Sequence, residues 1–184
     1  MNTNRILLPS ILIISVMAIV LISGFYIYSQ QGGTKIKIGS LVPEFTLPDQ
    51  NGNDFDLRNV IGKKNLVIYF YPKDETIGCT KEACSFRDKY EAFVKADAMV
   101  IGISSQSIDS HKEFSEKYNL PFTLLSDSEN TVHKLFGVST NEKGSIAGRV
   151  TFVVDKNGVV IYTFNSLTQP LKHVEEALRI LKAK

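Results

Sequence analysis

Cys79 and Cys84 are the only two cysteines in this chain of 184 residues. They stand where an apolar run, residues 66–71, gives way to a helical pattern, so Cys79 opens the predicted helix and Cys84 lies more than one turn inside it. Five residues of α-helix separate two Cα atoms by about 8.7 Å, whereas a disulfide needs roughly 4.4–6.8 Å. The two thiols are therefore either unrelated or a redox pair whose bond requires the start of the helix to unwind.

Cys79 occupies a position that suits a nucleophile. The reactive form of cysteine is the thiolate. Free backbone N–H groups and the positive end of the helix dipole favour a negative charge at a helix N-terminus. The alternative for either cysteine is a small buried packing residue, since free cysteine is often buried. Cys84 fits that alternative better, because it lies off the centre of the apolar stripe of its helix.

The stretch 71–84 reads Tyr-Pro-Lys-Asp-Glu-Thr-Ile-Gly-Cys-Thr-Lys-Glu-Ala-Cys and resembles the active-site segment of peroxiredoxins, most closely the Q-type or bacterioferritin-comigratory-protein branch. Its Pro-x-x-x-Thr-x-x-Cys pattern is met by Pro72, Thr76 and Cys79. Further similarity lies in residues 42–47, 120–127 and 149–155, and the resemblance extends over roughly residues 37–184. Ile77 departs from the pattern, because this branch usually has proline there.

The resemblance implies a thiol-dependent peroxidase that acts on hydrogen peroxide and organic hydroperoxides. Cys79 would attack the peroxide and become a sulfenic acid. Cys84 would resolve it as an intramolecular disulfide, and a thioredoxin-like dithiol would then reduce that bond by exchange. No metal, haem or flavin is implied, and the resemblance favours a monomer.

Four other residues gain roles from the same resemblance. Arg149 would stabilise the thiolate and orient the peroxide, because a guanidinium stays charged and has several donors. Thr76 would donate a hydrogen bond to the peroxide oxygen, and Pro72 would shield the sulfur. Glu82, one turn after Cys79, would either orient Arg149 or serve only as a partner of the helix dipole.

The elements that must position these residues alternate along the chain. Buried strands are predicted over 66–71, 99–103 and 122–125, with helices after each, at 79–93, 107–118 and 130–136. Strands 150–154 and 159–164 flank Asn157-Gly158, a type I′ hairpin signal. A last helix begins near Pro170, with Leu171, Val174, Leu178 and Leu181 on one face. This order predicts a mixed α/β sheet with helices on both faces, and the resemblance implies a thioredoxin-like fold.

Composition and charge narrow the function classes. The net charge is +2, and no basic stripe interleaves with aromatic residues, so nucleic acid is not an expected partner. The three histidines, His111, His133 and His173, are far apart and lack the spacing of metal ligands, which predicts surface or edge positions.

The N-terminal segment predicts a membrane anchor. Residues 6–28 contain no charged side chain and span about 35 Å as a helix, enough for a ~30 Å hydrocarbon core. A cleaved signal peptide is the alternative, but no A-x-A cleavage site is present. We expect a flank at 1–5, an anchor or uncleaved signal at 6–28, a linker at 29–37 and the peroxiredoxin-like domain at 38–184. With the amino end inside, that domain lies on the non-cytoplasmic side.

Other function classes fit the residues less well. A membrane-anchored thiol–disulfide oxidoreductase acting on protein thiols would need Cys-x-x-Cys, and four residues separate the cysteines here. A copper-delivery protein would need two closer cysteines and a distant histidine. A non-catalytic membrane-tethered scaffold would explain the anchor but not the set of Thr76, Cys79 and Arg149.

Overall fold

The computed structural model describes residues 36–139 and 148–183. The predicted flank and anchor, and the linker up to residue 35, lie outside the described residues. Within the two described ranges, no helix is both long enough and apolar enough to cross a membrane.

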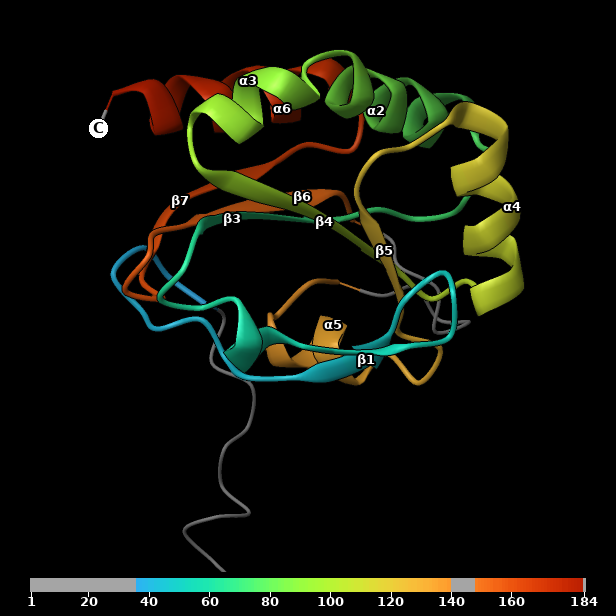
Figure 1. The fold of residues 1–184 in the computed structure, drawn as a ribbon, viewed down its shortest axis with the longest axis horizontal. Helices are drawn as coiled ribbons and strands as arrows, with labels where there is room; N and C mark the ends of the chain where they lie inside the picture. Colours follow the sequence, from blue (N-terminus) through green and yellow to red (C-terminus); the bar gives the residue numbers. More distant parts are fainter. Residues whose placement is uncertain (1–35, 140–147, 184) are drawn as a thin grey trace, which may run out of the picture. The chain divides into compact units, whose positions relative to one another are not determined.

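A mixed five-stranded sheet forms the centre of the domain (Figure 1). Its strands, in the order in which they neighbour one another, are β5 (Thr123–Ser126), β4 (Ala98–Ser104), β3 (Asn65–Phe70), β6 (Val150–Val154) and β7 (Val160–Asn165). The strands β3, β4 and β5 are parallel, while β6 runs antiparallel to β3 and β7 antiparallel to β6. The predicted mixed sheet is confirmed, and its central strands are apolar throughout because both faces are covered.

Helices cover both faces of this sheet (Figure 1). One face packs against helices that lie on the side of the cysteines, namely α2 (Ile77–Asp88), α3 (Tyr90–Lys95), α4 (Ile108–Tyr118) and α6 (Pro170–Lys182). The other face packs against a smaller layer, which consists of the β1–β2 hairpin (Thr46–Pro48 and Asp54–Asp56), the short η1 (Leu57–Asn59) and α5 (Thr131–Leu135). This arrangement is the thioredoxin-like fold that the family resemblance implies.

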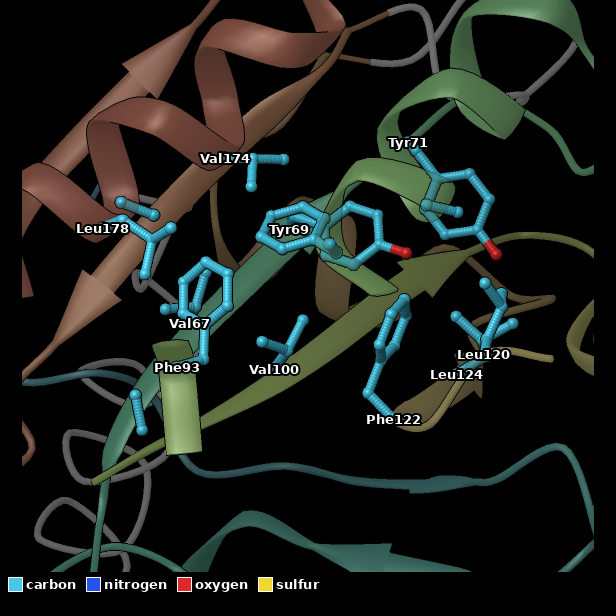
Figure 2. Packing of buried hydrophobic residues seen from close by; sticks show 14 of the residues in the cluster. Val67, Tyr69, Tyr71, Phe93, Val100, Leu120, Phe122, Leu124, Val174 and Leu178 are labelled. Carbon is cyan, nitrogen blue, oxygen red and sulfur yellow. The ribbon is translucent and has the colours of Figure 1, made fainter. Parts of the chain in front are cut away.

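Aromatic stacking fixes α2 against the sheet, and Figure 2 shows two of the rings involved, those of Tyr69 and Tyr71. The ring of Tyr69, from β3, stacks on Phe86 of α2 with centroids 4.6 Å apart, and Tyr71 stacks on Tyr69 at 5.3 Å. Gly102 makes room for this stack, since a Cβ there would lie 2.7 Å from the Tyr69 ring. The helix that bears both cysteines therefore rests on a rigid aromatic layer.

Three local predictions are wrong. The helix predicted over 79–93 ends at Asp88, and a second helix, α3, starts at Tyr90. At the β6–β7 hairpin only Gly158 has a positive φ, and the Asp155 carboxylate accepts from the N–H groups of Asn157 and Val159, which excludes a type I′ turn. Leu171, predicted to share one face with Val174, Leu178 and Leu181, is 48% exposed, whereas those three residues are buried.

Candidate active site

Cys79 lies in the first turn of α2 and is 1% exposed. The residue before the helix, Thr76, is extended, so the chain leaves the end of β3 through a short loop and turns directly into α2. Both cysteines are free thiols, and both lie inside α2. The geometric prediction therefore holds, since a regular helix keeps their Cα atoms too far apart for a disulfide.

The sheet brings Arg149 to the sulfur across 70 residues of sequence. Phe70, the last residue of β3, pairs with Val150, the first of β6, so the residue before β6 lies beside the start of α2. The Arg149 Nη2 donates to Cys79 Sγ at 3.4 Å, and Nη1 donates to Glu82 Oε2. Gly78 permits this approach, because its Cβ position is 3.1 Å from Nη2.

Glu82 is fully buried one turn after Cys79. Burial raises the pKa of its carboxyl to about 8, although the neighbouring Arg149 guanidinium acts in the opposite direction. One carboxyl oxygen, Oε2, accepts from Arg149, whereas Oε1 is buried and has no hydrogen-bond partner among the residues that the structure describes. The prediction that Glu82 contacts Arg149 agrees with this geometry.

His173 completes the cluster, and its predicted surface position is wrong. It comes from α6, is fully buried, and its Nδ1 lies 3.8 Å from Glu82 Oε1. The Thr151 hydroxyl is 2.8 Å from that Nδ1, and Nε2 donates to the Ser166 carbonyl at 2.9 Å. Burial lowers the pKa of His173 to about 4, so the ring is neutral. Its helical spacing from Ala177, in register with the apolar stripe, is a sequence signal for burial.

His111 is also buried, and it ties the loop before α2 to α4. Its Nδ1 lies 2.9 Å from Asp74 Oδ2, and Tyr71 and Ser110 donate to the same carboxylate at 2.7 Å each. Burial alone would raise the pKa of Asp74, but the hydrogen bonds from His111, Ser110 and Tyr71 outweigh it and hold the pKa below its ordinary value. This polar cluster fixes the loop that delivers Cys79.

His133 is the third buried histidine. Its Nδ1 lies 2.5 Å from Asp127 Oδ2, and the same carboxylate oxygen accepts from the His133 backbone N–H at 2.8 Å. All three histidines thus have buried hydrogen-bond partners, and the partners of His111 and His173 include residues far away in the sequence. His133 lies on α5, on the opposite face of the sheet from Cys79.

The remaining predicted residues lie around this cluster. Thr76 is exposed, and its hydroxyl donates to the Lys73 carbonyl at 3.2 Å, within the loop before α2. Pro72 is half-buried in the same loop, and Cys84 is half-buried on the next turns of α2. The structure therefore brings Cys79 and Glu82 into contact with Arg149. Thr76, Pro72 and Cys84 lie outside this group of contacts.

An open groove adjoins the start of α2. It has a volume of about 700 Å³ and lies between that helix and the segment leading into α6. Its lining includes three exposed apolar side chains, Ile77, Leu167 and Leu171. Ile77 and Gly78, which line the groove, immediately precede Cys79 in the sequence, so the groove adjoins the turn of α2 that carries this residue.

Comparisons with known proteins show which family and which solved structures this chain is similar to. The chain matches the AhpC/TSA family over residues 38–163. It is 54% identical over 149 residues to "Peroxiredoxin Q, chloroplastic" of Oryza sativa subsp. japonica and of Arabidopsis thaliana, covering 81% of this chain and 68% of each relative. Among solved structures, BcpB of Mycobacterium tuberculosis has a TM-score of 0.77 at 36% identity, over 80% of this chain and 97% of that one. Peroxiredoxin Q of Xanthomonas campestris has a TM-score of 0.71 at 31% identity, over 80% and 96%.

Proposed function

The chain belongs to the AhpC/TSA family, in its peroxiredoxin Q branch, and from this membership we propose that it reduces hydrogen peroxide and organic hydroperoxides with Cys79 as the attacking thiolate. The contact of 3.4 Å between Arg149 Nη2 and Cys79 Sγ is the observation that supports this assignment best. A buried guanidinium stabilises a thiolate, and its remaining donors can bind a peroxide oxygen.

The first step forms an S–O bond and breaks the O–O bond. The sulfur of Cys79 is oxidised by two electrons to a sulfenic acid, and the peroxide leaves as water or an alcohol after taking up one proton. Arg149 stabilises negative charge on the sulfur before attack and on the departing oxygen after it. Within this proposal, Pro72 shields the sulfur, and Thr76 donates to the peroxide oxygen once its hydroxyl turns away from the Lys73 carbonyl.

The second step requires α2 to open. Cys84 Sγ attacks the sulfenic sulfur, water leaves, and an intramolecular disulfide forms. Because both residues are helical in the reduced form, the first turns of α2 must unwind before the sulfurs can meet. A thioredoxin-like dithiol then reduces the disulfide by exchange and allows α2 to refold.

The groove beside Cys79 supports organic hydroperoxides as substrates. Its apolar lining by Ile77, Leu167 and Leu171 can contact the alkyl chain of a hydroperoxide that approaches the first turn of α2. Burial of an alkyl chain contributes about 0.8 kcal/mol for each CH₂ group. Hydrogen peroxide has no alkyl chain, so it needs only the polar groups at Cys79 and Arg149.

The position of the protein in the cell is part of the proposal. Residues 6–28 act as an uncleaved single-pass anchor, 29–37 as a linker, and the domain at 38–184 lies on the non-cytoplasmic side of the membrane. The charge-free apolar sequence of the segment supports this assignment. We also propose that the domain acts as a monomer.

Single-turnover oxidation of the reduced full-length chain tests the proposed peroxidase. Hydrogen peroxide should be consumed rapidly, one equivalent per chain, with formation of a disulfide between Cys79 and Cys84. Cys84→Ser should consume its equivalent and stop at the sulfenic acid. Cys79→Ser is the matched change on the same helix, and equal consumption of peroxide by this variant would refute the assignment.

A further inference from the structure

Two buried acids share one buried cation at this site. Arg149 is 3% exposed, Cys79 1% and Glu82 0%, and the guanidinium donates to both the sulfur and the carboxyl group. An unpaired charge in such a place costs several kcal/mol. A thiolate and a carboxylate together would leave one negative charge without a counter-ion, so the cluster favours a single negative charge.

The other titratable groups near Glu82 supply no positive charge. His173, from α6, is neutral because burial lowers its pKa to about 4. Tyr69, from β3, is neutral because burial holds the pKa of its phenol well above the ordinary value. Cys79 is the second acid, on α2 itself. Among the described groups that interact with Glu82, Arg149 is thus the one cation.

The hydrogen bonds around Glu82 indicate where a proton would reside. His173 Nε2 donates to the Ser166 carbonyl, so the neutral ring has no proton on Nδ1 and cannot donate to Glu82. Oε1 lies 3.8 Å from that Nδ1 and has no donor among the residues that the structure describes. A buried carboxylate oxygen without a donor is unfavourable, and protonation of Glu82 removes the negative charge that this oxygen would share. The raised pKa of Glu82, about 8, agrees with this placement.

Building on the peroxidase function proposed above, we propose that Cys79 and Glu82 share one negative charge over Arg149, so that Glu82 is protonated while Cys79 is a thiolate. Attack on peroxide turns the charged thiolate into a neutral sulfenic acid. Arg149 then lacks an anion, and Glu82 ionises. The released proton balances the one that the departing hydroxide or alkoxide takes up, so a thiolate, a neutral carboxyl group and a hydroperoxide become a sulfenic acid, a carboxylate and an alcohol or water.

Proton counting during a single turnover tests this charge sharing. The reduced full-length chain carrying Cys84→Ser is mixed with hydrogen peroxide in weakly buffered solution containing a pH indicator, while thiolate absorbance is followed in parallel. At neutral pH we expect a thiolate signal that disappears with almost no net uptake of protons, about zero per peroxide. Uptake should rise toward one as the pH passes about 8, where Glu82 is ionised before the reaction.

Glu82→Gln provides the comparison, because glutamine keeps the size and the acceptor of the protonated acid but has no proton to release. In that background the uptake at neutral pH should be about one proton per peroxide. Glu113→Gln, an exposed change on α4, should match the parent. An infrared difference spectrum of the parent protein should also lose a protonated-carboxyl band on oxidation, and this readout does not depend on any Glu82 variant folding.

The outcomes separate this inference from the peroxidase function. Uptake of about one proton by both the parent and Glu82→Gln would show that Glu82 does not change its protonation when Cys79 is oxidised, which overturns the inference. Absence of a thiolate signal at neutral pH in a protein that still reduces peroxide would also overturn it. If neither thiolate loss nor a sulfenic acid follows addition of peroxide, the proposed peroxidase itself fails.

Discussion

At the scale of single residues, Arg149 connects the two buried acids Cys79 and Glu82. Its planar guanidinium presents one N–H to the Cys79 sulfur and another to the Glu82 carboxyl group. This geometry depends on a rigid fork of donors, which lysine lacks. Glu82 and His173 lie behind the arginine, away from solvent, and determine its charge environment.

Arg149→Lys should slow the reaction of Cys79 with hydrogen peroxide by about 10²–10³-fold, the usual effect of losing a preorganised donor. The ammonium group of lysine is not planar, so it cannot present two fixed N–H groups at once to the Cys79 sulfur and the Glu82 carboxyl group. Stopped-flow consumption of peroxide at constant pH measures this rate. Arg58→Lys changes an exposed arginine and should leave it unchanged; a rate for Arg149→Lys equal to the parent would contradict the assigned role.

In the His173→Gln variant, the free energy of unfolding should fall less steeply than in the parent as the pH is lowered below about 6.5. The pKa of His173 is about 4 in the folded protein against an ordinary 6.5, so the unfolded chain binds a proton first as the pH falls. The stabilisation is therefore complete above pH 6.5 and is lost as the pH falls toward 4, by about 1.4 kcal/mol for each pKa unit. Urea unfolding of parent and variant across this range measures the difference, with Lys172→Gln as the control on the same helix. If the free energy of unfolding depended on pH in the same way in the parent and in His173→Gln, the assignment of His173 as buried and neutral would be wrong.

At the scale of elements, α2 must satisfy two opposed demands. It holds Cys79 beside Arg149 when folded, and it must open before Cys84 can reach the same sulfur. The aromatic layer under Phe86 and the polar cluster at Asp74 hold the helix and its preceding loop on either side of the active turn. The opening can therefore be confined to the first turns of α2.

Ile77→Pro should stabilise the folded protein by about 0.4–1 kcal/mol, because proline suits the first position of a helix and restricts the unfolded chain. Ile77 is the first residue of α2 and is 79% exposed, and the extended Thr76 is compatible with a following proline. Chemical denaturation of the reduced protein measures the change. Ile77→Ala removes the same side chain without fixing φ and should lie close to the parent; destabilisation by proline alone would show that α2 does not begin at residue 77.

At the scale of the whole molecule, residues distant in sequence meet at one end of the sheet. The antiparallel pairing of β6 with β3 places Arg149 next to α2, and α6 adds His173 from the last quarter of the chain. The described domain contains an apolar core on each face of the sheet. Its folding therefore needs nothing from the predicted anchor.

Removal of residues 1–35 should release the protein from membranes and leave the rate of peroxide consumption within about twofold, since the described domain has its own core. The full-length chain should sediment with membranes and resist extraction at high salt, because burial of about 20 apolar residues anchors a helix in the bilayer. Fractionation followed by peroxide assays measures both effects. Recovery of the full-length chain in the soluble fraction would contradict the anchor.

The sequence alone predicted most elements of the central sheet and its helices, and the family resemblance supplied the proposed roles of the two cysteines. Periodicity and apolar runs indicated the strands, the helix that bears both cysteines and the mixed sheet, because these patterns report burial along a single element. The spacing of Cys79 and Cys84 shows by itself that a disulfide between them would require unwinding, since helix geometry is the same in every protein. The turn at Asn157-Gly158 was assigned wrongly because the Asp155 side chain, rather than the dipeptide, sets its backbone conformation.

Tertiary structure decided which side chains meet and what charge they carry. His111, His133 and His173 looked like surface residues because the sequence does not show which carboxyl, hydroxyl and carbonyl groups the fold brings to them. The sequence suggested that Glu82 contacts Arg149, but its burial and its unpartnered oxygen depend on the packing of α2 and α6. Desolvation determines the protonation of such a group, and desolvation is a property of the folded molecule.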